Sequence, residues 1–85
     1  MELRLSDTAK EDIRFFHKTG QKGILKKIER LLGEMKESPF KGSEKPEPLK
    51  FDLAGKWSRR INDEHRILYT VEKDFIQVHS LKGHY

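Results

Sequence analysis

The 85-residue sequence contains no cysteine, only three prolines and one tryptophan, and no apolar stretch long enough to span a membrane as a helix. The absence of cysteine excludes a disulfide framework and any metal site built on thiolates, and it is typical of a reducing compartment. Residues 1–6 lack the apolar core of a signal peptide. We therefore expect a soluble protein of the cytoplasm.

Charged side chains are abundant, and basic ones exceed acidic ones. Eighteen Lys and Arg stand against 14 Asp and Glu, which gives a formal charge of +4. This balance favours anionic partners such as nucleic acids, although the same charge could simply keep a small surface soluble. A chain of this length forms one domain over residues 1–85, at the small end of what can bury a core alone. Because the basic residues are spread along the chain, folding must build any positive patch.

The N-terminal half predicts one strand and two helices. Residues 2–5 alternate polar and apolar, as a short strand does. Ser6, Asp7 and Thr8 are favourable helix N-caps, and the helix that follows ends near Gly20. An apolar stripe at helical spacing predicts a second helix whose inner face belongs to the core. The stripe consists of Ile24, Leu25, Ile28, Leu31, Leu32 and Met35.

The C-terminal half predicts a loop and four short strands. Residues 38–46 read as a loop because of their prolines and glycine. Apolar alternation then predicts strands over residues 48–53, 57–61, 67–71 and 75–81. The sum, β-α-α-β-β-β-β, predicts an α+β fold with an antiparallel-rich sheet and two helices packed on one face. The other face is left partly open and can hold a ligand.

Three residues match the chemistry of phosphodiester cleavage by internal attack. That reaction needs a base for the 2′-hydroxyl proton, a cation on the phosphate oxygens and an acid for the leaving 5′-oxygen. Glu47, Arg66 and His84 supply these types, and histidine titrates at about 6.5. Tyr85 follows His84 and could stack on a base or orient the acid. No ligand spacing for a metal is present, so we expect neither metal nor cofactor.

Each candidate has a plain alternative. Glu47 lies between two prolines and could be an ordinary loop carboxylate, and His84 could be idle because chain ends usually fray. The arginines could be solvated, although arginines on adjacent short strands tend to gather across a hairpin. We assign the remaining aromatic and histidine candidates to structure rather than to chemistry: His17, His65, Trp57 and Tyr69.

Several blocks occur in the order and at the spacing of one known family. They are Ser38-Pro39-Phe40, Lys45-Pro46-Glu47-Pro48-Leu49-Lys50, Trp57-Ser58-Arg59-Arg60-Ile61, Asp63-Glu64-His65-Arg66 and His84-Tyr85. Several unrelated blocks in one order are more specific than any single motif. On these blocks the chain resembles the YoeB/Txe branch of the RelE superfamily, the toxins of bacterial type II toxin–antitoxin pairs, over nearly its whole length.

The resemblance implies a metal-independent endoribonuclease with a microbial-ribonuclease-like fold, which cuts mRNA in the decoding site of the 70S ribosome and so inhibits translation. By position, it implies that Glu47 is the general base, that Arg66 stabilises the phosphate, and that His84 is the general acid, supported by Tyr85. The basic residues that it implies for holding RNA or the developing charge are Lys45, Lys50, Arg59 and Arg60.

The resemblance also implies partners. We expect a cognate antitoxin of the YefM/Axe type whose C-terminal segment folds on the toxin, and a homodimer is a further expectation. The antitoxin complex would repress its own operon, and the toxin would meet DNA only through that complex. Two competing interpretations remain. One is a non-catalytic module that blocks the decoding site. The other is a small DNA-binding regulator, although the sequence shows no helix-turn-helix pattern. Substitution of Glu47 and His84 separates nuclease from blocker.

Overall fold

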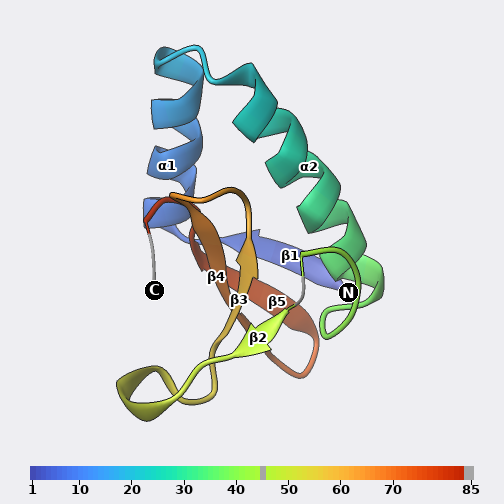
Figure 1. Ribbon diagram of the computed structural model, residues 1–85. Coiled ribbons are helices and arrows are strands. Elements are labelled where there is room, and N and C mark those ends of the chain that lie inside the picture. The colour runs from blue at the N-terminus through green and yellow to red at the C-terminus, as the bar shows by residue number, and fades with distance from the viewer. Residues whose placement is uncertain (45, 84–85) are drawn as a thin grey trace.

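The computed structural model describes residues 1–44 and 46–83, so the expectations placed on Lys45, His84 and Tyr85 lie outside the described residues. The elements follow the predicted order and confirm the α+β fold (Figure 1). They are β1 (Glu2–Leu5), α1 (Asp7–Lys18), α2 (Lys22–Glu37), β2 (Glu47–Pro48), the 3₁₀ turn η1 (Phe51–Leu53), β3 (Trp57–Arg60), β4 (Arg66–Val71) and β5 (Phe75–Ser80). No helix in the described ranges is both long and apolar enough to cross a bilayer.

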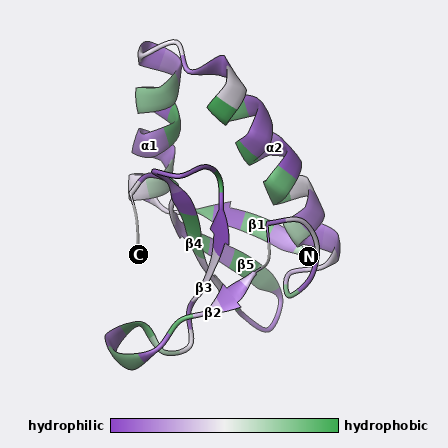
Figure 2. Cartoon of the chain, viewed as in Figure 1, coloured by the Kyte–Doolittle hydropathy of each residue, from purple (hydrophilic) through white to green (hydrophobic). Residues whose placement is uncertain are grey.

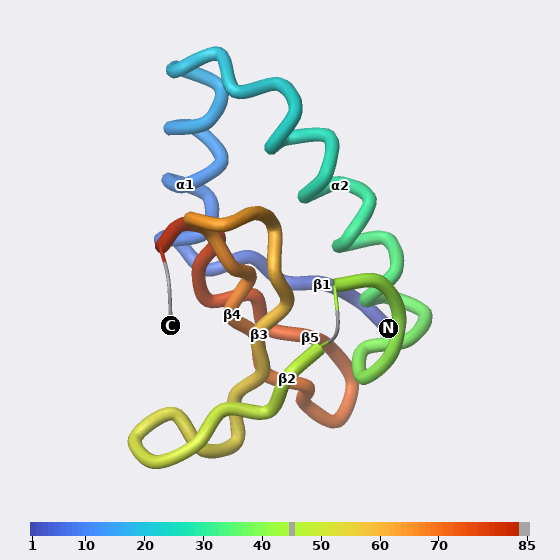
Figure 3. The backbone as a smooth tube through the Cα atoms, in the orientation of Figure 1, coloured from blue at the N-terminus to red at the C-terminus, as the bar shows by residue number. Residues whose placement is uncertain are grey.

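The five strands form one sheet in the order β1-β5-β4-β3-β2. Neighbouring strands are antiparallel except β1, which runs parallel to β5 and lies at one edge. The tube in Figure 3 shows the N-terminal strand beside β5, while β2 lies at the other edge. This order places β2, β3 and β4 side by side, and these strands carry the predicted site residues Glu47, Arg59, Arg60 and Arg66.

The core lies between the helices and one face of the sheet. Phe16 on α1, Leu31 and Met35 on α2, and Tyr69 and Ile76 on the sheet are fully buried. The apolar colours of both helices gather on the sides that face the sheet (Figure 2). This confirms the predicted stripe of the second helix and leaves the opposite sheet face without a helical cover.

Local capping explains where the first helix begins. The Ser6 side chain accepts a hydrogen bond from the Ala9 amide at 3.0 Å, which satisfies one of the free donors of the first turn. The same hydroxyl donates to the His79 carbonyl at 2.7 Å, so the cap also ties α1 to β5. The predicted group of N-cap residues is thus confirmed at Ser6.

The strand predicted over residues 48–53 is wrong. β2 is only Glu47–Pro48, and Phe51–Leu53 forms a 3₁₀ turn. The Leu49 amide donates to the Lys56 carbonyl at 2.9 Å, which closes a hairpin loop of residues 49–56. Phe51 has a φ of 58° and is 91% exposed, so the apolar alternation here does not mark a side chain packed on a sheet.

Candidate functional site

The register of the sheet places three of the predicted residues on the open face. Arg60 on β3 lies directly opposite Arg66 on β4, and Glu47 on β2 lies opposite Ser58. Residues opposite each other across antiparallel strands share a face, and so do residues two apart along one strand. Glu47, Arg60 and Arg66 therefore share one face, whereas the other face, with Tyr69, packs against the helices.

These residues line a charged cleft. Glu44, Glu47, Arg60 and Arg66 surround an open volume of about 440 Å³. Glu47 is exposed and Arg66 is half-buried. Two carboxylates and two guanidinium groups make a polar lining that fits an anionic, hydrogen-bonding ligand better than an apolar one.

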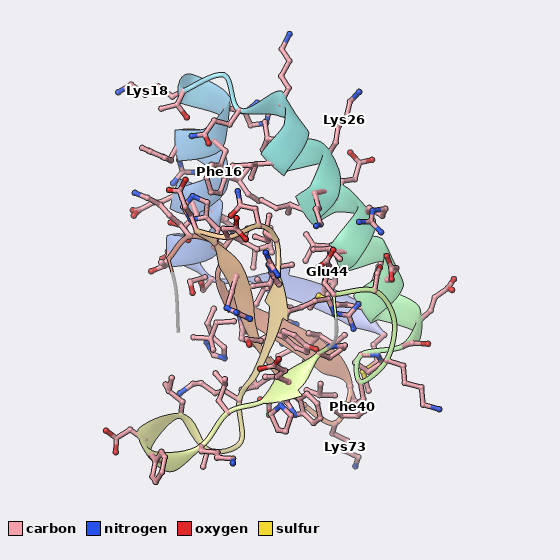
Figure 4. The ribbon with its side chains drawn as sticks, viewed as in Figure 1. Phe16, Lys18, Lys26, Phe40, Glu44 and Lys73 are labelled. Atoms are coloured by element: carbon pink, nitrogen blue, oxygen red, sulfur yellow. The ribbon has the colours of Figure 1, made fainter. Side chains whose placement is uncertain are left out.

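Two of the four charges in the charged cleft already have partners. Glu44 lies beside α2 (Figure 4), where its Oε1 is 2.7 Å from Lys27 Nζ. The hydrogen bond from Lys27 lowers the pKa of the Glu44 carboxyl, with burial acting in the opposite direction. Arg60 forms an ion pair with Asp63, three residues on.

The other two charged residues of the cleft, Glu47 and Arg66, have no oppositely charged partner among the described residues. Within residues 1–44 and 46–83, neither Glu47 nor Arg66 forms an ion pair. Arg66 Nε is buried and has no hydrogen-bond partner among the described residues. Buried donors are nearly always satisfied in folded proteins, so an orphan donor beside an open cleft is suited to a bound acceptor such as a phosphate oxygen.

The turn between β3 and β4 fixes the position of Arg66. The Asn62 side chain accepts hydrogen bonds from the amides of Glu64 and His65 at 2.9 and 2.8 Å, and these two bonds shape the turn. The Arg66 amide donates to the Gly83 carbonyl at 3.0 Å, and the Gly83 amide donates to His65 Nδ1 at 3.1 Å. The last described residue is thus held beside a residue of the charged cleft. His84 and Tyr85 follow it in the sequence.

The structural assignments of the other aromatic residues are confirmed. The His65 ring packs edge-on against Phe16, with 5.1 Å between ring centroids, in addition to its hydrogen bond from Gly83. Tyr69 is fully buried, and Trp57 packs against the core and against Phe40. None of these rings lines the charged cleft.

Arg59 does not face the cleft, contrary to the role implied for it in RNA binding. Its side chain is fully buried, because strand alternation turns it toward the helical side of the sheet. Its Nη2 donates to the carbonyls of Lys41 at 2.8 Å and Ser38 at 3.2 Å, and its Nη1 lies 4.0 Å from Glu34. Arg59 is therefore an anchor for the loop that precedes β2, and we exclude it from the RNA-binding set.

A second buried donor holds the same loop. The Tyr69 hydroxyl donates to the Pro39 carbonyl at 2.7 Å. Further along, Ser43 donates through its amide and its hydroxyl to the Glu34 carboxylate, and these two bonds lower the pKa of Glu34. These bonds hold the loop in place as far as Glu44.

The sequence did not single out Glu44 as a site residue. Its place depends on Lys27, which lies 17 residues earlier on α2, and on a left-handed backbone with a φ of 63°. Neither feature has a signal in the sequence. Lys50 is exposed directly after the strand that carries Glu47. Among the described residues, no group of three or more His, Cys, Asp or Glu side chains is arranged to hold a metal ion.

Comparison with known proteins identifies the family. A family model described as YoeB-like toxin of bacterial type II toxin-antitoxin system matches residues 5–85. The sequence is 41% identical to Toxin YoeB of Escherichia coli strain K12 over the full length of both chains. The fold matches a YoeB/ParE toxin from Agrobacterium tumefaciens with a TM-score of 0.93, at 39% identity and with complete coverage of both chains.

A relative from Staphylococcus aureus adds two assemblies. The structure of its YoeB dimer matches with a TM-score of 0.88, and that of its YoeB-YefM complex with 0.86. In both cases the identity is 41%, with coverage of 100% of this chain and 98% of the other. The chain belongs to the YoeB-like toxins of bacterial type II toxin–antitoxin systems.

Proposed function

We propose that this toxin is a ribosome-dependent endoribonuclease that cleaves mRNA in the decoding site and thereby stops translation. The observation that carries the proposal is the charged cleft, in which Glu47 and Arg66 face the open side of the sheet without ion-pair partners in the described part of the chain. One free carboxylate and one free guanidinium group are what an internal attack on a phosphodiester requires before an acid is added.

The proposed reaction moves two protons and breaks one bond. Glu47 takes the proton of the 2′-hydroxyl, whose oxygen attacks the adjacent phosphorus. Arg66 stabilises the charge that develops on the non-bridging oxygens. His84 gives a proton to the leaving 5′-oxygen, and Tyr85 supports His84. The products are a 2′,3′-cyclic phosphate, open to hydrolysis to a 3′-phosphate, and a 5′-hydroxyl.

The remaining basic residues would hold the RNA. Arg60 lines the charged cleft and Lys50 is exposed beyond β2, so both can reach a phosphate that flanks the cleaved one. We assign Lys45 to the same set from its position in the sequence. Phosphate contacts of this kind bind without reading the base, and they weaken as the salt concentration rises.

The open shape of the cleft explains a need for the ribosome. In-line attack requires the 2′-oxygen, the phosphorus and the 5′-oxygen to align, and an open cleft on a small sheet has little surface to impose this on flexible RNA. Fixing such a geometry can be equivalent to an effective molarity of about 10⁵ M or more. In our proposal the ribosome holds the codon, and the toxin supplies acid, base and cation in the cytoplasm.

We also propose an antitoxin partner. The Staphylococcus aureus relative is found in a YoeB-YefM complex and as a YoeB dimer, which supports both an antitoxin of the YefM/Axe type and self-association for this chain. The complex would repress its own operon. A disordered antitoxin segment that folds on the uncovered sheet face would also shield the charged cleft.

Primer extension on mRNA programmed into ribosomes tests the proposal. The wild-type protein should give a discrete cut in the decoding-site codon, and Glu47→Gln and His84→Gln should each weaken it by about 10² to 10⁴-fold. Glu11→Gln and His17→Gln, on the exposed side of α1, are matched controls that should cleave normally. Stalled ribosomes with intact mRNA in every case would favour the blocking module. Equal cleavage of naked and ribosome-bound mRNA would contradict the dependence on the ribosome.

A further inference from the structure

The loop between β2 and β3, residues 49–56, projects away from both helices and from the body of the sheet (Figures 1 and 3). Part of this projecting loop is hydrophobic (Figure 2). Phe51 is 91% exposed, whereas the other exposed large apolar side chains, Met1, Phe15 and Phe40, lie between 37% and 49%. The projecting loop therefore presents the most exposed large apolar side chain of the described residues.

The other two exposed rings have partners. Lys82 lies over the Phe15 ring at 3.9 Å, and Phe40 packs on Trp57 with 4.8 Å between centroids. In the described ranges, Phe51 makes no ring contact and no cation contact. Folding alone gives no reason for an aromatic residue at this position.

The backbone holds the Phe51 ring outward at a conformational cost. Its φ of 58° lies in the left-handed region, which a bulky residue adopts only when its surroundings enforce it. The enforcing contacts are backbone hydrogen bonds: Leu53 N to the Lys50 carbonyl at 3.2 Å, Ala54 N to the Phe51 carbonyl at 3.0 Å and Lys56 N to the Leu53 carbonyl at 3.0 Å. A positive φ that backbone hydrogen bonds maintain at an exposed, bulky residue points to a functional use of that residue.

Charged residues flank the Phe51 ring on both sides. Lys50 and Asp52, its neighbours on either side, are exposed, and Lys56 closes the projecting loop, so the loop carries a net positive charge. Protein interfaces surround their aromatic anchors with packed, water-excluding residues, whereas both direct neighbours of Phe51 are charged and exposed. Stacking on a nucleic-acid base needs only one free ring face, and single-strand binding sites combine such rings with basic residues.

The distance to the charged cleft suits a neighbouring nucleotide. Phe51 follows Glu47 by four residues, so their Cα atoms are at most about 14 Å apart even if the segment is fully extended. Resting on the proposed ribonuclease function, we propose that Phe51 is an RNA-binding residue that stacks on an unpaired mRNA base next to the cleaved phosphate.

Four variants of Phe51 test the role of the ring. Phe51→Ala and Phe51→Leu should raise KM for ribosome-bound mRNA and lower kcat/KM by about 5- to 150-fold, the usual cost of losing one stacked base. Phe51→Trp should retain near-normal cleavage because it preserves a stacking face. Phe51→Gly should lose cleavage as Phe51→Ala does, yet unfold at a higher temperature than that variant, because glycine adopts a positive φ freely.

Phe75 offers a matched control toward the opposite edge of the sheet from β2. Phe75 on β5 packs under Arg4 of β1, so Phe75→Leu removes a ring far along the strand order from β2 and should leave kcat/KM unchanged. Normal cleavage by Phe51→Leu beside an active wild-type protein would overturn the inference and leave the proposed function standing. Absence of cleavage by the wild-type protein would instead reject the proposed function.

An mRNA with an abasic nucleotide tests whether the base that stacks on Phe51 belongs to the mRNA. Placed beside the cleavage site, it should slow the wild-type toxin by about the same factor as Phe51→Ala and slow that variant little further, as coupled partners do. Equal slowing of both proteins would show that the ring contacts ribosomal RNA or a protein instead, and would overturn the inference. The same conclusion follows if Phe51→Leu weakens antitoxin binding while cleavage stays normal.

Discussion

Arg60 and Arg66 lie directly opposite each other across the antiparallel strands β3 and β4. Like charges in this position destabilise a sheet. Asp63 offsets the charge of Arg60, whereas Arg66 keeps a buried Nε without a partner among the described residues. The sheet thus tolerates repulsion at the charged cleft, and an anion bound between the two guanidinium groups would relieve it.

Inorganic phosphate should therefore stabilise the protein. A ligand at ten times its Kd stabilises the fold by about 1.4 kcal/mol, which corresponds to a rise in Tm of roughly 5 to 10 °C for a domain of this size. Thermal unfolding with and without phosphate, at constant ionic strength, measures the effect. Arg66→Gln should lose most of the shift, and Arg14→Gln, on the exposed part of α1, should keep it. An equal shift in Arg66→Gln would mean that phosphate acts through the solvent.

Under the proposed function, Asp63 should compete with RNA for Arg60. The two side chains form an exposed ion pair, with 49% of Arg60 and 90% of Asp63 accessible. Because an exposed pair contributes at most about 1 kcal/mol, Asp63→Asn should lower KM for ribosome-bound mRNA by up to about five-fold. Asp74→Asn, in the turn between β4 and β5, makes the same charge change away from the charged cleft and should have no such effect. Identical KM values for the two variants would contradict a competing role.

The sequence predicted what depends on local periodicity. The apolar stripe of α2 and the alternation along β4 and β5 were sufficient to place the core, and the order of elements followed. Alternation along the predicted strand of residues 57–61 puts Arg59 on the same face as Trp57 and Ile61, whereas the family resemblance implied a role for it in holding RNA. Its burial depends on the carbonyl groups of Ser38 and Lys41, which only the folded chain brings near.

The residues of the charged cleft were also predicted only in part from the sequence. Glu47 and Arg66 were identified by type and by family spacing, and the strand register accounts for their common face. Glu44 was missed because its place depends on an ion pair with Lys27 on another element. Phe51 was predicted within a strand because apolar alternation cannot show a left-handed residue at the tip of a hairpin loop.

Arg59 should be essential to the stability of the fold. Arg59→Met removes a buried charge with hydrogen bonds to the loop before β2 and leaves those carbonyl groups without their donor. Losing a hydrogen bond from a charged donor costs about 1.5 to 3 kcal/mol, a large part of the stability of a small domain. Tyr69→Phe loses only the bond to the Pro39 carbonyl and should cost about 1 kcal/mol. Urea unfolding measures both, and equal losses would contradict the anchoring role of Arg59.

His79 should make the stability depend on pH below 6.5, the ordinary pKa of histidine. Burial lowers the pKa of His79 below its ordinary 6.5, Lys56 lowers it further and Glu72 opposes them, so the folded state favours the neutral ring. The stabilisation is complete above pH 6.5 and is lost as the pH falls from there through the folded-state pKa, because the unfolded chain then binds the extra proton. The pKa values of Glu34 and Glu44 are lowered from 4.5, so the stabilisation that these carboxylates contribute is present above that pH and is lost only in more acidic solution.

Urea unfolding at several pH values tests the role of His79. His79→Gln removes the titrating ring but retains a side chain that can bond to Thr70, whose hydroxyl lies 3.0 Å from the His79 Nε2 atom. The free energy of unfolding should therefore change less with pH in this variant than in the wild-type protein. His17→Gln, at the exposed end of α1, should follow the wild-type curve. A slope in His79→Gln as steep as that of the wild-type protein would assign the dependence to other groups.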